Sequence, residues 1–187
     1  MKSLRYALPL LAGLTLLPAA QAVEFTTVQP AASRLGFTFK QMNVPVEGRF
    51  SRFTSRLNFD PAKLAAAKAS LEIDLASIDA GSAEANDEVL GKAWFNAKTY
   101  PKATFDSTAV RAVGGNRYEV VGKLTIKGRT QEVTAPVTLS TQGKSAVFDG
   151  TLPIRRADFA IGEGSWSDFG IVANDVQIRF HLVADAK

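Results

Sequence analysis

Alternation of apolar and polar residues restricts the fold of this chain more than any other feature. Residues of one parity are apolar in five segments: 35–39, 71–75, 118–126, 133–139 and 176–182. In the first, Leu35, Phe37 and Phe39 alternate with Thr38 and other residues of the opposite face. Successive side chains of a β-strand point to opposite faces, so each segment predicts a strand with one buried and one hydrated face. This one-sided burial is typical of antiparallel sheets.

Further strands and tight turns are expected between these segments. Strands with a less regular pattern are predicted near 44–50, 53–59, 102–113 and 144–154. Gly114-Gly115 and Lys127-Gly128 are predicted to be hairpin turns, because glycine takes positive φ without strain. Eight or nine antiparallel strands must hide their edges, either in a closed barrel or in a sandwich of two sheets. Periodicity alone does not decide between these folds, nor between a filled and a hollow barrel.

Two short helices are expected to interrupt the strands. Asp60-Pro61 is typical of a helix start, with an N-cap followed by proline, and predicts a helix over 62–67. Ser82 is predicted to cap a second helix over 83–93, where Glu84 lies favourably near the positive end of the helix dipole. We find no internal repeat or linker, so one domain is expected.

The first 22 residues are predicted to be a secretory signal peptide that is cleaved after Ala22. Lys2 and Arg5 form a positively charged start. The apolar residues 7–17 follow, and Ala20-Gln21-Ala22 is a small-x-small cleavage site. The apolar run is too short to span a bilayer. We therefore expect residues 23–187 to form a domain that is soluble outside the cytoplasm.

Composition excludes several classes of function. The chain has no cysteine and one histidine, which removes thiol nucleophiles, cysteine-ligated metals and any site that needs two histidines. The net charge is +4, and Lys2 and Arg5 of the predicted signal peptide account for half of it. Lysine and arginine are scattered among acidic residues, so nucleic acid is not an expected partner.

No catalytic or metal-binding residue is predicted. The single histidine, His181, lies at a polar parity of the last strand and is expected to face solvent. The carboxylate pairs Glu72/Asp74 and Asp87/Glu88 are expected on hydrated faces, and a glycosidase would need two carboxylates converging on one cleft. A hydrolase is therefore the weakest alternative, because no nucleophile is paired with a base.

Aromatic side chains are the candidates for a binding site. Many of the phenylalanines lie at inward parity, among them Phe37, Phe39 and Phe105. Trp94 extends the apolar face of the helix expected over 83–93. Trp166 lies in a long predicted loop over 159–169, which we expect to cover one mouth of a barrel. Core packing is the alternative explanation for most aromatic residues. Five residues are predicted to contact a ligand: Phe37, Phe39, Phe105, Trp94 and Trp166.

Several segments resemble the YceI-like family of bacterial periplasmic polyisoprenoid-binding proteins. They are SRLGFTFKQMNVPVEGRF (33–50), SIDA (77–80), YPKATFDST (100–108), YEVVGKLTIKGRT (118–130) with 133–139, and RADF (156–159). The resemblance runs in order from about residue 26 to residue 182. It implies an antiparallel, lipocalin-like, eight-stranded barrel in the periplasm. A polyprenyl or isoprenoid-quinone tail would lie in its apolar cavity, with no catalytic residue.

The resemblance also implies a partner, but this chain lacks some polar residues that many family members have. Some members lie beside or are fused to cytochrome b561-type membrane proteins, which implies a quinone-linked partner of this kind. Many members have a histidine where this chain reads Lys40-Gln41-Met42. Many also have an Arg-Asp-x-His-Leu run where this chain reads Ala85-Asn86-Asp87-Glu88-Val89. Headgroup contacts made by those polar residues are therefore not carried over.

Two other functions stay open from the sequence. One is a barrel that binds another amphiphile, such as a fatty acid or a fatty amide. The other is a filled barrel that acts as a stress or protein-interaction module. No cofactor is expected apart from a bound isoprenoid lipid. The headgroup, the tail length, the oligomeric state and the donor and acceptor membranes are not indicated.

Overall fold

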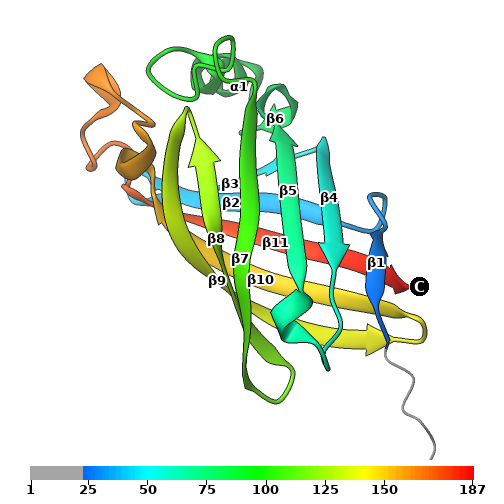
Figure 1. Cartoon of the computed structure of the whole chain (residues 1–187). Coiled ribbons are helices and arrows are strands. Elements are labelled where there is room, and N and C mark those ends of the chain that lie inside the picture. Colours follow the sequence, from blue (N-terminus) through cyan, green and yellow to red (C-terminus); the bar gives the residue numbers. More distant parts are fainter. Residues whose placement is uncertain (1–22) are drawn as a thin grey trace, which may run out of the picture.

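A curled antiparallel sheet forms the main body of the structure, a computed structural model that describes residues 23–187 (Figure 1). The predicted signal peptide lies outside the described residues. The strands are β1 (Phe25–Val28), β2 (Arg34–Gln41), β3 (Val44–Phe50), β4 (Phe53–Asn58), β5 (Lys68–Asp74), β6 (Ile78–Asp79), β7 (Lys102–Gly114), β8 (Arg117–Ile126), β9 (Arg129–Gln142), β10 (Ser145–Arg155) and β11 (Asp175–Ala186). One α-helix, α1 (Ala83–Leu90), lies at one end of the sheet.

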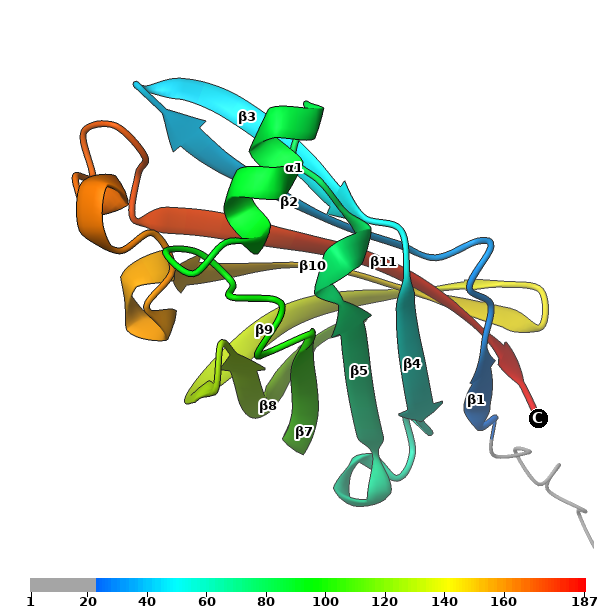
Figure 2. The same ribbon diagram turned by 90° about the horizontal axis from the view of Figure 1, so that it is seen from above.

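The order of the strands explains how the sheet curls into a lipocalin-like half-barrel. The hydrogen-bonded order is β4-β5-β7-β8-β9-β10-β11-β2-β3-β6. β1 pairs with β11, and Phe25 of β1 exchanges two backbone hydrogen bonds with Phe59 just after β4, at 2.9 and 3.1 Å. β1 thus connects the two sides of the curled sheet at the end opposite α1 (Figure 2). The predicted all-β antiparallel, lipocalin-like class is confirmed, but the sheet has eleven strands rather than the predicted eight. Nine strands have six or more residues, and β1 and β6 are shorter.

The predicted hairpin turns occur where the glycines indicated. Lys127 (φ 49°) and Gly128 (φ 72°) join β8 to β9, and Gly115 (φ 61°) begins the two-residue turn that joins β7 to β8. Gly114 (φ 108°) is the last residue of β7, where the register between the two strands shifts. These left-handed conformations match the twist of the flanking strands, which is why two-residue hairpin loops favour them.

The helical predictions are only partly correct. Ser82 caps α1 by accepting a hydrogen bond from the Ala85 N–H, as expected. The helix ends at Leu90, before Gly91, rather than at residue 93. Instead of a helix over 62–67, there is one 3-10 turn at Leu64–Ala66, since only nine residues separate β4 from β5. The other 3-10 turns are Leu75–Ser77, Arg156–Phe159 and Gly164–Trp166.

The core residues line the inside of the curled sheet in two main clusters. The cluster near α1 includes Leu75 (1% exposed), Phe159 and Trp94. The cluster near β1 includes Phe25 and Phe148, whose rings meet edge to face with centroids 6.4 Å apart. Among the described residues, no helix is both long enough and apolar enough to cross a bilayer.

Candidate functional site

Two apolar cavities lie inside the curled sheet and share part of their walls. The larger, here called the wide cavity, has a volume of about 450 Å³ and lies beside α1. The smaller, the narrow cavity, has about 120 Å³ and lies toward β1. The residues that line both are Leu35, Ile73, Leu124 and Ile178. These four side chains, here called the constriction, therefore form a wall common to the two cavities.

The structure places the five predicted ligand-contacting residues in the walls of these two cavities. Four of them line the wide cavity: Phe37, Phe39, Trp94 and Trp166. The fifth, Phe105, lines the narrow cavity beyond the constriction. All five therefore face the interior, although they come from two strands, a loop and a 3-10 turn.

Other lining residues were not predicted as site residues. Phe50 and Phe95 line the wide cavity, and their rings meet edge to face at 6.4 Å. Tyr118 lines the narrow cavity and packs against Phe59 at 5.2 Å. Phe50 ends a strand of less regular pattern, and Phe95 follows α1 in a loop, so alternation did not mark either of them. Tyr118 had the correct parity and could have been included.

Glycines on neighbouring strands keep this interior from being filled. The ring of Phe37 lies over Gly48, its partner in the β2–β3 register, so that a Cβ there would come within 2.6 Å of the ring. The ring of Phe105 lies over Gly122 in the same way. A ring that packs against a glycine lies closer to the wall and leaves more of the lumen open. The aromatic content of the chain is therefore compatible with a hollow barrel.

Arg156 is a buried cation that holds the loop beside the wide cavity. Only 2% of it is exposed, and it lines that cavity. Its guanidinium donates five hydrogen bonds of 2.7–3.2 Å to backbone carbonyls, those of Ile161, Gly162, Trp166, Val172 and Ala173. Burial lowers the pKa of Arg156, but an arginine in a protein stays protonated. Because five carbonyls use all five donors, the residue acts as an anchor for residues 161–173.

The wide cavity reaches the surface between α1 and this loop. Two exposed carboxylates of α1, Glu84 and Glu88, are part of its lining. The indole N–H of Trp166 donates to Glu88 Oε1 at 2.7 Å and so connects the loop to the helix across this mouth. Trp94 packs against Trp166 with centroids 5.4 Å apart, and its own indole N–H is buried without a partner. Trp166 thus occupies the position expected for a lid.

A second attachment fixes the loop on the other side. Lys127 Nζ, in the β8–β9 turn, donates to the Ala160 carbonyl at 2.7 Å and to Glu163 Oε2 at 2.8 Å. The hydrogen bond from Lys127 keeps the pKa of Glu163 below its ordinary value. The loop over residues 156–172 is therefore held by Arg156 from inside, by Lys127 from one side and by Glu88 from the other.

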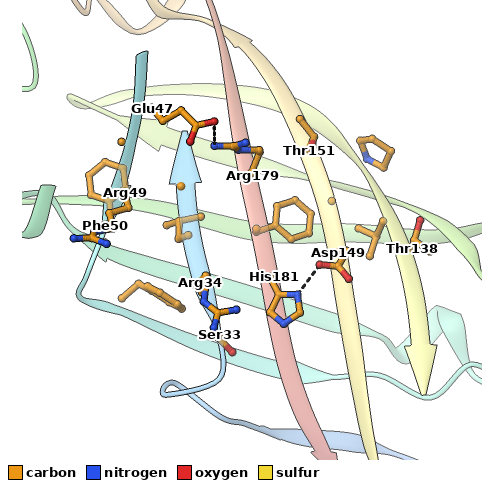
Figure 3. Close-up of a pocket in the computed structure, with 18 of the residues that line it drawn as sticks. Ser33, Arg34, Glu47, Arg49, Phe50, Thr138, Asp149, Thr151, Arg179 and His181 are labelled. Atoms are coloured by element: carbon orange, nitrogen blue, oxygen red, sulfur yellow. Dashed lines mark hydrogen bonds and ion pairs between the residues drawn. The ribbon is translucent and has the colours of Figure 1, made fainter. Parts of the chain in front are cut away.

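A third depression, here called the polar groove, lies on the outer face of the sheet and has a different character. Its volume is about 1340 Å³ and it is open to solvent. Figure 3 shows Arg179 paired with Glu47 at 3.0 Å and His181 paired with Asp149 at 2.7 Å. Charged side chains line it, so it does not suit an apolar chain. The outward position predicted for His181 is correct.

The polar groove contains no catalytic arrangement that we can identify. His181 has a carboxylate partner, but a hydrolase also needs a nucleophile within reach of the base. Ser33 lines the same groove, yet its hydroxyl donates to the Gln29 carbonyl at 2.7 Å and accepts from the Val183 N–H. Among residues 23–187, no group of three or more metal-binding side chains is close enough to hold an ion.

A curled antiparallel sheet that forms a half-barrel around apolar cavities is typical of the lipocalin-like class of folds. The chain belongs to one family of this class, the YceI-like family. The model of the YceI-like domain matches residues 27–184.

Comparison with individual proteins agrees with this assignment. A UPF0312 protein of Pseudomonas putida (strain W619) is 33% identical over 142 residues, which cover 72% of this chain and 71% of that protein. The crystal structure of BcnA from Burkholderia cenocepacia is 54% identical, with a TM-score of 0.82, over 84% of this chain and 99% of that one.

A more distant structure carries a description of its ligand. It is a polyisoprenoid binding domain from Saccharophagus degradans, implicated in plant cell wall breakdown. It is 20% identical, with a TM-score of 0.68, over 88% of this chain and 99% of that one. At this identity the likeness concerns the fold.

Proposed function

We propose that the protein binds and carries a long-chain isoprenoid lipid, such as a polyprenyl or quinone tail, in the periplasm. The observation that carries the proposal is the pair of apolar cavities inside the curled sheet, which share the constriction as a wall. We propose that a bound chain passes the constriction and so follows one interior path from the aromatic mouth beside α1. Ligand pockets of about 300–1,000 Å³ are typical of small-molecule sites, and the wide cavity lies in this range. Family membership and the name of the distant relative support an isoprenoid as the guest.

The shape of the path favours a flexible chain over a compact molecule. A guest that fills both cavities must pass Leu35, Ile73, Leu124 and Ile178, so it must be thin at this point. Branched methyl groups of an isoprenoid would pack against the aromatic walls on either side. The proposed ligand contacts are those predicted from the sequence, with Phe50, Phe95 and Tyr118 added.

Energetics favour a carrier over an irreversible store. Transfer of a chain of roughly forty carbons from water would yield about 30 kcal/mol at about 0.8 kcal/mol per methylene. This exceeds the limit of about 18–21 kcal/mol for non-covalent complexes, so only part of such a chain is expected to be buried. A chain that arrives from a bilayer exchanges one apolar environment for another. Loading and unloading are therefore close to equilibrium.

The location and the partners are part of the proposal. The predicted signal peptide supports export, and we propose a membrane protein of the cytochrome b561 type as the source or acceptor of a quinone. We propose a binding role without catalysis and without a resident cofactor other than the lipid. A fatty acid or fatty amide is the alternative guest, because an unbranched chain also suits an apolar path.

Native mass spectrometry of the protein, purified without detergent, tests this function. We expect a stoichiometric adduct that organic extraction identifies as an isoprenoid. The control is a variant with Leu124→Trp, which should close the constriction and remove the long-chain adduct. A fatty acyl adduct would keep the barrel function and change the ligand class. An apo mass that persists when prenyl lipids are supplied would reject the carrier proposal.

A further inference from the structure

Four apolar side chains at the mouth end of the molecule face solvent. Met42 (69% exposed) and Val44 (62%) belong to the β2–β3 hairpin, while Phe169 (50%) and Ile171 (39%) follow the 3-10 turn that contains Trp166. We call these four residues the apolar tip. The Met42 N–H donates to the Ile171 carbonyl at 2.7 Å, so the two segments lie side by side (Figure 2).

The apolar tip is continuous with the wall of the wide cavity. Gln41 and Val172, which are chain neighbours of tip residues, form an isolated β-bridge with each other. Both of them also line the wide cavity, together with Trp166 at the mouth. A chain that leaves the cavity at this end therefore emerges beside exposed apolar side chains.

The backbone conformation of the β2–β3 turn indicates that the apolar residue Met42 serves a function there. Met42 (φ 47°) and Asn43 (φ 64°) are both left-handed, as in a type I′ turn. Asparagine, aspartate and glycine are preferred at such positions, and methionine is an unfavourable choice there. Residues that break a local preference are concentrated at functional sites. Phe169 is held in place as well, since the Arg156 guanidinium lies 5.1 Å from its ring centroid.

The charge of the tip argues against an electrostatic partner. Residues 40–44 and 167–173 contain one cation, Lys40, and one anion, Asp168. Four side chains on two adjacent turns are also few for a stable protein–protein interface, which buries about 800 Å² on each partner. Apolar residues at a turn can instead enter the boundary between lipid headgroups and acyl chains, where they bind weakly and reversibly.

We propose that the apolar tip docks on the surface of a lipid bilayer and that the isoprenoid chain passes between membrane and cavity there. This inference rests on the proposed carrier function. The carboxylates of Glu84 and Glu88 beside the mouth keep contact shallow and disfavour anionic lipids. Binding is therefore driven by apolar contact and changes little with salt concentration.

Flotation with protein-free vesicles of equal parts phosphatidylethanolamine and phosphatidylcholine tests the docking. The test variant is Met42→Asn with Val44→Thr, because asparagine suits the left-handed turn and threonine matches valine in shape. The matched control is Val113→Thr, which changes an apolar residue that is 46% exposed in the distant β7–β8 hairpin. We expect the test variant to bind vesicles about tenfold less than the wild type, and the control to bind normally.

Transfer of a prenyl quinone of four isoprene units between vesicles separates this inference from the carrier function. We expect the test variant to hold the quinone in solution as well as the wild type does, but to transfer it about tenfold more slowly. Transfer at the wild-type rate, or wild-type binding only to vesicles that carry a membrane protein, would overturn the docking proposal. Wild-type protein that floats with vesicles but takes up no quinone or other prenyl lipid would instead reject the carrier function and leave the docking surface in place.

Discussion

Gly122 lies against the ring of Phe105, which lines the narrow cavity, and we expect this glycine to keep the cavity open. In Gly122→Ala the new methyl group would come within 2.5 Å of the Phe105 ring and 2.7 Å of the Asp106 carbonyl oxygen. We expect the ring to move into the cavity, with a loss of about 1–3 kcal/mol in the free energy of unfolding. Long prenyl chains should then bind more weakly. Urea unfolding and competition between prenyl chains measure the two effects.

A control for this change exists on the outer face of the sheet. Gly36→Ala adds a methyl group to β2 where the only close atom is the Gly48 carbonyl oxygen, at 3.1 Å. It should affect stability less and leave chain binding unchanged. Equal ligand binding by Gly122→Ala and the wild type would show that the Phe105 ring does not limit the cavity.

Side-chain direction was predictable from the sequence, but the hollow interior was not. The parity of Leu35, Phe37 and Phe39 correctly indicated which side of β2 faces inward. Whether an inward ring fills the lumen depends on the residue beneath it on the next strand, such as Gly48 below Phe37. That residue is set by the register between strands, which periodicity within one strand does not contain.

The loop over residues 156–172 is organised by one side chain, Arg156. We expect Arg156→Lys to destabilise the protein strongly, because an ammonium has three donors without the planar fork that reaches five carbonyls. Hydrogen exchange should increase at the amides of residues 161–173 and stay unchanged in β7 and β8. If protection in the loop is the same in Arg156→Lys, the guanidinium is not the anchor.

The link between Trp166 and Glu88 is expected to control exchange of the ligand. Glu88→Ala removes the acceptor of the Trp166 indole N–H, whereas Glu88→Gln keeps an acceptor oxygen. We expect ligand to leave faster from Glu88→Ala and at nearly the wild-type rate from Glu88→Gln. Trp166→Ala should exchange ligand fastest, and an unchanged rate there would remove Trp166 from the role of a lid.

We expect a fall in pH to weaken side-chain hydrogen bonds between elements before it affects the packing of the core. Hydrogen bonds from Lys127 to Glu163, and from Ser145 and Gln29 to Asp185, hold the pKa of each carboxyl below its ordinary value of 4.5 or 3.8. A lowered pKa in the folded state contributes stability that is present above the ordinary value and lost as pH falls below it. The free energy of unfolding should therefore be level near neutral pH and decrease below about pH 4.5. Asp185→Asn should make this decrease less steep, and an unchanged slope would contradict the assignment.

Element boundaries were less predictable than element types. Ser82 correctly indicated the start of α1, because an N-cap is a local signal. Asp60-Pro61 gave an equally good local signal, but the chain must return to β5 within a few residues and forms only a 3-10 turn. Arg156 was not predicted as a buried cation, because its partners are carbonyls that the folded loop brings together.

Across the whole molecule, the length of the interior path is expected to select the length of the bound chain. Ala135→Leu places a larger side chain in the narrow cavity, beyond the constriction, where Ala135 is 5% exposed. Prenyl chains short enough to lie in the wide cavity should bind this variant as they bind the wild type, whereas longer chains should bind more weakly. A set of prenyl alcohols of increasing length, measured by competition, gives the comparison.

The matched control for chain length lies at the other end of the path. Ala85, on α1, lines only the wide cavity, so Ala85→Leu should weaken binding of short and long chains alike. The difference between the two variants depends on the order of the cavities from mouth to end, because a chain that enters beside α1 fills the wide cavity first. If Ala135→Leu weakens short and long chains equally, the two cavities do not act in series, and a guest does not pass the constriction at Leu124.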